Sequence, residues 1–275
     1  MLSSCASVKT TDAGAIGLDR VQYFEDGARE RMVTDAATSY DKLLQAALKH
    51  NALNVDAEAT QRIVRIANRL IPHVQQFRPD AQAWAWEVNL ISIDEPNATC
   101  RAGGKITVYT GLLDKWKPTD DELAAVIGHE IGHALRDHTA EKYSTRKRNS
   151  SVATGLSSVL SIGLAVFTGV NLSNTIGQAG QAGAEAFANL PNSRELEHES
   201  DRIGMELMAR AGYDPRAAIT LWSKVAGLSK SGGGESSFWS THPSDNERIQ
   251  DLTQVETKVR ALYQAATAAP TQGGR

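Results

Sequence analysis

The sequence has few cysteines and little net charge, and each of these features excludes a class of protein. Its 275 residues include two cysteines, Cys5 and Cys100, which are too few for a disulfide framework. The formal net charge is −3 and no basic stripe stands out, which argues against nucleic acid as a partner. The one basic cluster, residues 142–148, is interpreted as a solvated helix end, with an anionic membrane surface as the alternative partner.

A signal for lipid attachment is present only in part. Residues 2–5 read Leu-Ser-Ser-Cys, which looks like a bacterial lipobox, where the cysteine becomes the lipidated first residue after signal cleavage. The four residues before Cys5 hold neither a charged region nor an apolar region, so we do not expect them to form a complete signal peptide. We predict that residues 1–25 form a tether, lipidated at Cys5, that holds the protein on the outer membrane in a bacterial periplasm. The alternative is a disordered N-terminus with a free thiol.

A long stretch without charge lies in the second half of the chain. Residues 149–184 contain no Asp, Glu, Lys or Arg. Within this stretch, residues 152–170 are about long enough to cross a bilayer, but serines, threonines and glycines dilute their hydrophobicity. We predict a buried or mobile helical lid over the helix that precedes it, and a membrane-facing loop is the alternative.

Residues 120–135 have the pattern of a helix. Their apolar residues recur at spacings of three and four, which is typical of a helix with one apolar face: Leu123, Val126, Ile127, Ile131 and Leu135. Thr119 or Asp120 can cap the start, and three acidic residues in the first turn suit the positive end of the helix dipole.

This helix carries the sequence His-Glu-Ile-Gly-His. His129 and His133 lie one turn apart, so both imidazoles leave the same face and can bind one Zn²⁺ ion. Glu130 lies about 100° round the helix from His129. From there its carboxylate can take a proton from a water molecule that the metal polarises. The sequence therefore predicts one zinc site per chain, with Glu130 as the catalytic base.

A second motif, in residues 193–204, offers the third ligand, and we predict a helix over residues 195–211. Glu197 and Asp201 are four residues apart, so they face the same way on a helix. Glu197 is the preferred ligand because Asp201 follows it one turn on and can accept the second ring N–H of a ligating histidine. Rival ligands on other faces of the helix are Glu195, His198 and Glu199.

These motifs resemble a known family. His-Glu-Ile-Gly-His, followed about 60 residues later by SRELEHESDRIG, resembles the gluzincin zinc endopeptidases of the HtpX and CAAX-prenyl-protease family. Within that family the match is to bacterial envelope proteases of the BepA and LoiP type and their mitochondrial relatives. The resemblance implies that Glu197 is the third zinc ligand and that Asp201 supports the ligands from behind. It also implies a mainly helical α+β zincin domain with a small edge-strand sheet, over residues 26–270.

Strands are expected beside this site. Residues 84–93 and 105–110 are rich in aromatic and β-branched residues, and we predict that they pair antiparallel across a turn. Residues 97–106 (NATCRAGGKI) resemble the family's N-A-F-x-x-P-G-G-K-I, with Thr99 and Ala102 in place of Phe and Pro. The resemblance implies an edge to which an extended substrate can add as a strand, made by Gly103, Gly104, Lys105 and Ile106.

The stretch Thr241-His242-Pro243 resembles the family's Thr-His-Pro. The resemblance implies that His242 is either a removable plug on the zinc or a donor that stabilises the transition state. The alternative is a helix-entry histidine next to a proline that sets the turn. Arg248, in the last helix, can pair with an active-site carboxylate or lie on the surface, and His138 and His198 are expected to be structural.

The motifs thus predict a zinc-dependent endopeptidase. The resemblance to the family implies a role in envelope protein quality control, with unfolded or misassembled proteins and the outer-membrane assembly machinery as partners. One alternative is a chaperone-like assembly factor for the outer membrane, whose zinc site is latched by His242. Another is a zinc enzyme that cleaves a non-protein amide, which the predicted edge strand argues against because small substrates need no strand pairing.

Overall fold

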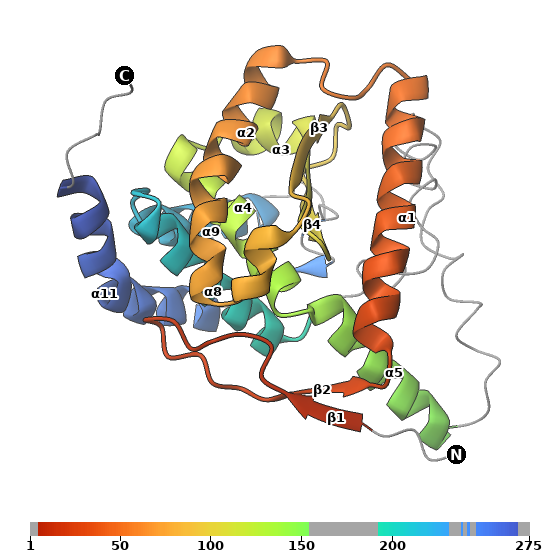
Figure 1. Cartoon of the computed structure of the whole chain (residues 1–275). Coiled ribbons are helices and arrows are strands. Elements are labelled where there is room, and N and C mark those ends of the chain that lie inside the picture. Colours follow the sequence, from red (N-terminus) through yellow and green to blue (C-terminus); the bar gives the residue numbers. More distant parts are fainter. Residues whose placement is uncertain (1–4, 154–191, 231–237, 239–240, 243–245, 269–275) are drawn as a thin grey trace.

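The computed structural model describes residues 5–153, 192–230, 238, 241–242 and 246–268, and Figure 1 shows how its elements are arranged. The strands are β1 (Cys5–Val8), β2 (Gln22–Glu25), β3 (Glu87–Ile91), β4 (Ala98–Arg101) and β5 (Lys105–Tyr109). The helices are α1 (Ala28–Lys49), α2 (Ala57–Leu70), α3 (Thr110–Trp116), α4 (Asp120–Leu135), α5 (His138–Ala153), α8 (Arg194–Arg210), α9 (Arg216–Lys230) and α11 (Asn246–Ala268). Two short 3-10 helices, η1 (Ile71–Gln76) and η2 (Pro79–Ala83), follow α2. The predicted mainly helical α+β fold is confirmed.

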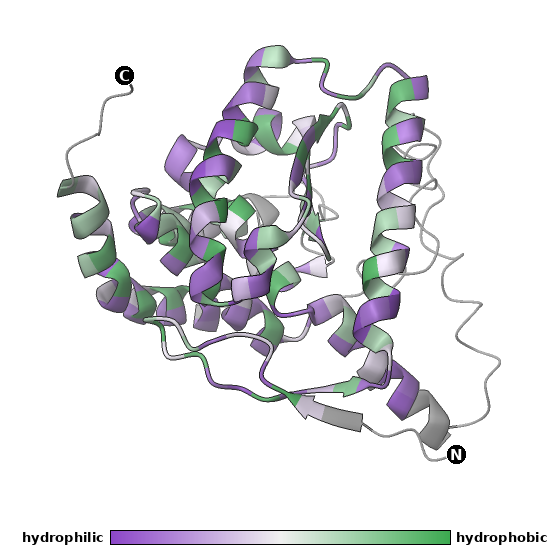
Figure 2. Cartoon of the chain, in the orientation of Figure 1, coloured by the Kyte–Doolittle hydropathy of each residue, from purple (hydrophilic) through white to green (hydrophobic). Residues whose placement is uncertain are grey.

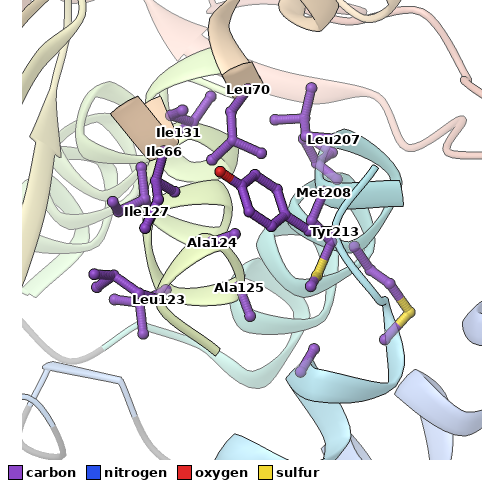
Figure 3. Close-up of a cluster of buried hydrophobic side chains, with 14 of the residues drawn as sticks. Ile66, Leu70, Leu123, Ala124, Ala125, Ile127, Ile131, Leu207, Met208 and Tyr213 are labelled. Atoms are coloured by element: carbon purple, nitrogen blue, oxygen red, sulfur yellow. The ribbon is translucent and has the colours of Figure 1, made fainter. Parts of the chain in front are cut away.

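Helix α4 lies at the centre of the fold and is buried from Glu122 to Leu135. Helices α2, α8 and α9 pack against it. Figure 3 shows that side chains of α2, α4 and α8 meet in one apolar cluster, among them Ile66, Leu70, Leu123, Ile127, Ile131, Leu207 and Met208. A helix covered on every side belongs to the core, so the metal-binding motif lies on a helix that tertiary packing holds in place.

Glycines let α4 and α8 cross with their backbones in contact. A Cβ atom at Gly204 would lie 2.6 Å from the backbone nitrogen of His129. A Cβ atom at Gly132 would lie 2.9 Å from Cα of Ser200. No larger residue fits at these points without moving a helix, because real Cβ atoms do not approach backbone so closely. The crossing therefore brings the first turns of α8 next to the histidines of α4.

Local signals fix where the two helices begin. The Thr119 side chain accepts a hydrogen bond from the backbone N–H of Glu122, and the Glu122 carboxylate accepts one from the backbone N–H of Thr119. This reciprocal pair is a capping box, so Thr119 and not Asp120 is the cap. On α8, Ser193 accepts a hydrogen bond from the backbone N–H of Leu196. The caps set the registers that place the ligands.

Helix α1 runs beside the sheet, next to its edge strand β4. Its buried residues repeat every three or four positions: Ala28, Met32, Ala36, Ser39, Tyr40, Leu43 and Ala47. Figure 2 shows hydrophobic and hydrophilic residues alternating along α1, as expected for a helix with one face on the protein. It packs against β4, α5 and β2, so α1 forms a wall beside the edge of the sheet.

The direction of one strand differs from the prediction. The sheet has the order β3-β5-β4, with β3 parallel and β4 antiparallel to β5. The predicted antiparallel pairing of residues 84–93 with residues 105–110 is therefore wrong. The prediction failed because it placed only a turn between the two strands. That stretch contains the short strand β4, which pairs with β5 and adds one more reversal of the chain.

The predicted substrate edge is wrong for the same reason. Lys105 and Ile106 lie in β5, whose two sides are both occupied by hydrogen-bonded strands. Gly103 and Gly104 form the turn before it, with φ of +82° and +83°, which glycine adopts without strain. The edge of the sheet that lies against α4 is β4.

The N-terminal residues are part of the domain. Strands β1 and β2 pair antiparallel, and Ile16, Leu18 and Phe24 are buried. Gln22 is also buried and donates a hydrogen bond to the backbone oxygen of Arg136, 114 residues away. The prediction of a tether over residues 1–25 is wrong for residues 5–25. Their composition alone does not show the distant partners that hold them.

The predicted lid falls largely outside the described residues. Helix α5 runs to Ala153, and residues 154–184 of the uncharged stretch are not among those that the structure describes. Within the described ranges, none of the helices has an apolar window long enough to span a bilayer.

Candidate metal centre

Four buried side chains from three parts of the chain converge at the α4–α8 crossing. His129 and His133 of α4, Glu197 of α8 and His242 each offer a ligand atom, and these atoms lie within 4.8 Å of one another. The Nε2 atoms of His129 and His133 are 3.0 Å apart. The carboxylate oxygens of Glu197 lie 3.4 Å from His129 Nε2 and 3.3 Å from His133 Nε2. The structure thus brings together the three predicted ligands, His129, His133 and Glu197, and places His242 beside them.

The ring of His129 is oriented from behind by Asp201. His129 Nδ1 lies 2.8 Å from Asp201 Oδ1. Arg248 of α11 donates to both oxygens of that carboxylate, each at 2.8 Å. An ionised carboxylate only accepts hydrogen bonds, so His129 carries its proton on Nδ1 and directs the Nε2 lone pair to the cluster. Of the two alternatives for Arg248, the structure shows the pairing with carboxylates of the site and a buried side chain.

The two α4 histidines differ in basicity. Burial lowers the pKa of His129, but the negative charges of Glu197 and Asp201 outweigh burial and raise it. Burial lowers the pKa of His133 well below its ordinary value. His133 is therefore ready to bind a cation at neutral pH, while a cation at His129 Nε2 competes with a proton.

Glu197 is held ionised in a fully buried position. Burial raises its pKa, but His242 and Arg248 outweigh burial and lower it well below its ordinary value. Arg248 Nη1 lies 3.0 Å from Glu197 Oε2, and the Asn192 amide donates to Glu197 Oε1 at 2.6 Å. Asn192 also accepts a hydrogen bond from Lys142. The sequence had singled out neither Asn192 nor Lys142 for this site, because no local pattern marks contacts made between distant segments.

The donor set fits a zinc ion. Two imidazole nitrogens with lone pairs and one carboxylate meet within hydrogen-bond distance of one another, and they are the ligand types of catalytic zinc sites. Glu130 Oε1 and Glu197 Oε2 are buried and accept no hydrogen bond within the described part of the chain, although Glu197 Oε2 has an ion pair with Arg248. Buried polar atoms normally have a partner, and a cation beside these oxygens would supply one.

Glu130 lies next to the cluster and is buried. Its Oε1 is 3.5 Å from His242 Nε2. The Glu130 carboxylate also accepts a hydrogen bond from the backbone N–H of Cys100 in β4. Burial raises the pKa of Glu130, although the nearby His242 and His129 act in the opposite direction. A carboxylate with a raised pKa beside a metal site can exchange a proton with a reacting group.

His242 lies inside the cluster. Its Nδ1 is 3.1 Å from Glu197 Oε1 and 3.2 Å from His129 Nε2. Its ring stacks on Phe238 with centroids 4.4 Å apart. These contacts argue against a histidine that only enters a helix.

The rival ligands lie elsewhere. The side chain of Glu195 is 63% exposed and faces Arg20. His198 lies 3.3 Å from Asp251 of α11, on another face of α8. Glu199 faces His138 and two arginines behind the metal centre.

A cavity of about 70 Å³ lies over Glu130 and His133. Its walls come from β4, through Thr99 and Cys100, and from α1, through Met32 and Ala36. The space beside the candidate base is therefore bounded by the edge strand on one side and by α1 on the other.

Comparisons with known proteins agree with this geometry. Residues 57–256 match the family model described as Peptidase family M48. Mitochondrial metalloendopeptidase OMA1 of Arabidopsis thaliana is 39% identical over 178 residues, 65% of this chain and 33% of that protein. Metalloprotease LoiP of Escherichia coli strain K12 is 28% identical over 253 residues, 92% of this chain and 90% of that protein. Beta-barrel assembly-enhancing protease of Escherichia coli O157:H7 is 27% identical over 210 residues, 75% of this chain and 41% of that protein.

The matches cover only part of the OMA1 relatives, and the family model covers only part of this chain. The OMA1 proteins of Arabidopsis thaliana, Schizosaccharomyces pombe and Saccharomyces cerevisiae are matched over 33%, 46% and 49% of their own lengths. The segment that fits the family model holds all four clustered side chains and Glu130. It begins after β1, β2 and α1.

Proposed function

The chain belongs to peptidase family M48, and we propose that it is a zinc-dependent endopeptidase that binds one zinc ion per chain. The observation that carries the proposal is the convergence of His129, His133 and Glu197 in one buried place beside Glu130. Two histidines and a glutamate are the protein ligands of one class of catalytic zinc site, which keeps a further position open for water or substrate.

The roles of the residues follow from their positions. His129, His133 and Glu197 hold the metal, which when bound polarises a peptide carbonyl and makes water a stronger nucleophile. Glu130 takes the proton of the attacking water and later gives it to the leaving amine. His242 is near enough to both Glu130 and Glu197 to donate to a developing oxyanion or to cover the metal.

The substrate is an extended polypeptide that pairs with β4. This strand is at the edge of the sheet, and the backbone of its Cys100 already contacts Glu130. A chain added to β4 would therefore pass beside the catalytic base, with main-chain hydrogen bonds that do not depend on sequence. This mode suits unfolded or misassembled proteins, which expose such segments.

The place of action is the bacterial cell envelope. The similarity to LoiP and to the beta-barrel assembly-enhancing protease supports this location. We further propose that Cys5 is lipidated, that the chain faces the periplasm from the outer membrane, and that substrates come from outer-membrane assembly. Mass spectrometry of the protein from its host tests the lipid, since an unmodified Cys5 behind an intact leader contradicts it.

Cleavage of a denatured protein such as casein tests the enzymatic proposal. The wild type is expected to cleave it, and Glu130→Gln is expected to retain its zinc while the rate falls by about 10²-fold to 10⁴-fold. His198→Gln is the matched control, because His198 lies on another face of α8. Equal rates for the wild type and Glu130→Gln would remove Glu130 from the mechanism. The same Glu130→Gln variant can then trap physiological substrates for identification by proteomics.

A second function is favoured by the contacts of His242. Because this side chain faces both Glu130 and Glu197, it can latch the site closed, and the protein would then serve mainly as an assembly factor. Cleavage that appears only in His242→Ala supports the latch. Strong cleavage by the wild type that falls in His242→Ala supports the donor role.

A further inference from the structure

On the side away from the metal site, the ring of His133 contacts His138 of α5, which in turn contacts Glu199 of α8. His133 Nδ1 lies 2.8 Å from Nδ1 of His138 on α5. His138 Nε2 in turn lies 3.1 Å from Glu199 Oε2 on α8. All three side chains are buried. The support of this ligand therefore has an extra imidazole that the support of His129 lacks.

The chain of contacts fixes where the protons are. An ionised Glu199 only accepts hydrogen bonds, so His138 donates to it from Nε2. A neutral His138 then accepts at Nδ1, and His133 must donate from its own Nδ1. His133 Nε2 is left with a lone pair that faces the Glu197 carboxylate and His129. The negative charge on Glu199 thus selects the tautomer of the ligand His133, through the intervening ring of His138.

Two arginines keep that charge in place. Arg136, the residue after α4, lies 3.1 Å and 3.0 Å from the two oxygens of Glu199. Arg20, from the loop that leads into β2, lies 2.6 Å and 2.8 Å from the same two oxygens. Arg20 also donates to both oxygens of Glu141 on α5, at 2.5 Å and 2.9 Å. One guanidinium therefore ties α5 and α8 together directly behind His138.

Arg20 is itself anchored by its segment. Its backbone oxygen accepts a hydrogen bond from Arg136 at 3.1 Å. The neighbouring Gln22 donates to Glu141 and to the backbone oxygen of Arg136. Earlier in the segment, Ile16 donates its backbone N–H to Glu206 of α8. Residues 5–25, here called the N-terminal segment, thus reach the metal centre with a fixed geometry.

We propose that the N-terminal segment is a functional part of the metal centre, and that Arg20 is a positioning residue for the ligand His133. The proposal rests on the proposed zinc site and goes beyond it, because Arg20 lies outside residues 57–256, which match the family model. Arg20 touches neither metal nor substrate. It acts through Glu199 and His138, by holding the carboxylate that orients the imidazole behind His133.

Arg202 offers a matched comparison for Arg20. Arg202 also makes a two-point ion pair, to Asp251, and lines the same surface cavity as Arg20. Its partner lies on α11 and has no contact with His138 among those described. Loss of an ion pair affects both variants, but only the loss of Arg20 changes the support of His133.

The zinc affinity of Arg20→Gln, measured in the full chain by competition with a chelator, tests the proposal. Glutamine keeps the first part of the side chain and an amide donor near the position of Arg20 Nε, and it removes the charge together with the two outer nitrogens that contact Glu141 and Glu199. We expect zinc to bind about tenfold more weakly, since loss of a group that orients a ligand typically costs 10-fold to 100-fold in metal affinity. Arg202→Gln is expected to bind zinc as the wild type does.

Nitrogen-15 spectra of the histidine rings supply a second readout, which a purely structural role does not change. In the zinc-loaded wild type, His133 is expected to carry its proton on Nδ1. In Arg20→Gln, the His133 and His138 signals are expected to shift or broaden while those of His129 stay. Unchanged zinc affinity together with unchanged ring signals would overturn the proposal. Failure of the wild type itself to bind zinc would instead overturn the proposed function.

Discussion

The two histidine ligands are supported by two different regions of the molecule. On the α11 side, His129 meets Asp201 directly, and one arginine from α11 holds that carboxylate. On the N-terminal side, Nδ1 of His133 reaches a carboxylate only through His138, and two arginines hold that carboxylate. The first arrangement is short and lies within the segment that matches the family model. The second is longer and draws on residues before that segment.

The difference shows two ways to fix the same ring geometry. Both arrangements end in a carboxylate of α8, and both carboxylates are two residues apart on that helix. The charges of Glu197 and Asp201 outweigh burial and raise the pKa of His129, so the direct carboxylate adds to the basicity of that ligand. Burial lowers the pKa of His133 well below its ordinary value, and the imidazole of His138 stands where a carboxylate would lie at its Nδ1. The α11 side is therefore expected to matter more for metal affinity.

The largest effect is expected from Asp201→Ala. This change removes the support of His129 and leaves the buried Arg248 with one carboxylate partner fewer. Zinc affinity should fall about 10-fold to 100-fold, and the free energy of unfolding should fall by about 1–3 kcal/mol, because the buried Arg248 guanidinium loses two hydrogen-bond acceptors but keeps its pair with Glu197. Chelator competition and urea unfolding measure the two quantities. Asp251→Ala is the control, since its pair is partly exposed.

The next effect concerns the crossing that both sides share. In Gly204→Ala, the new methyl group would lie 2.6 Å from the backbone nitrogen of His129 and would push α4 and α8 apart. We expect a loss of about 1–3 kcal/mol in stability, with weaker zinc binding because Glu197 moves with α8. Gly227→Ala on α9 is the control, because its Cβ would meet nothing within 4 Å. A Gly204→Ala variant as stable as the wild type would contradict the close crossing.

A smaller effect is expected from His138→Leu on the N-terminal side. The ligand His133 keeps its place on α4 but loses the acceptor that fixes its tautomer. Zinc affinity should fall about tenfold, at the lower end of the range for such supports. Chelator competition again provides the measurement. If His138→Leu costs more affinity than Asp201→Ala, the ranking of the two sides is reversed.

The smallest effect is a pH dependence specific to the N-terminal side. Burial raises the pKa of Glu141, but hydrogen bonds from Arg20 and Gln22 outweigh burial and lower it. A carboxyl group with a lowered folded-state pKa stabilises the protein above its unfolded pKa of about 4.3, and this stabilisation is lost as the pH falls through the folded value. The stability gap between the wild type and Arg20→Gln should therefore be widest near neutral pH and close in acid. Urea unfolding of the metal-free proteins across the acid range measures it, and a gap independent of pH contradicts it.

The sequence was sufficient wherever the determining contacts are local. The spacing of His129 and His133 and the apolar pattern around them predicted α4 and its metal-binding face. The four-residue step from Glu197 to Asp201 predicted a ligand and its supporting carboxylate, and Asp201 does contact His129.

The sequence was not sufficient where distant segments meet. The parallel pairing of β3 with β5 depends on β4. This strand has four residues, which are too few for an alternating pattern of apolar and polar residues to predict it. The burial of residues 5–25 depends on ion pairs such as Arg20 with Glu199, which are 179 residues apart. No periodicity records such a contact, and only the folded chain reveals it.

X-ray absorption spectroscopy at the zinc edge of the loaded protein shows whether His129 and His133 both direct their Nε2 lone pairs to one metal beside Glu197. We expect a shell of nitrogen and oxygen ligands at about 2.0–2.2 Å, with the multiple scattering of at least two imidazoles. A sulfur ligand at about 2.3 Å, or the signature of a single imidazole, would contradict it.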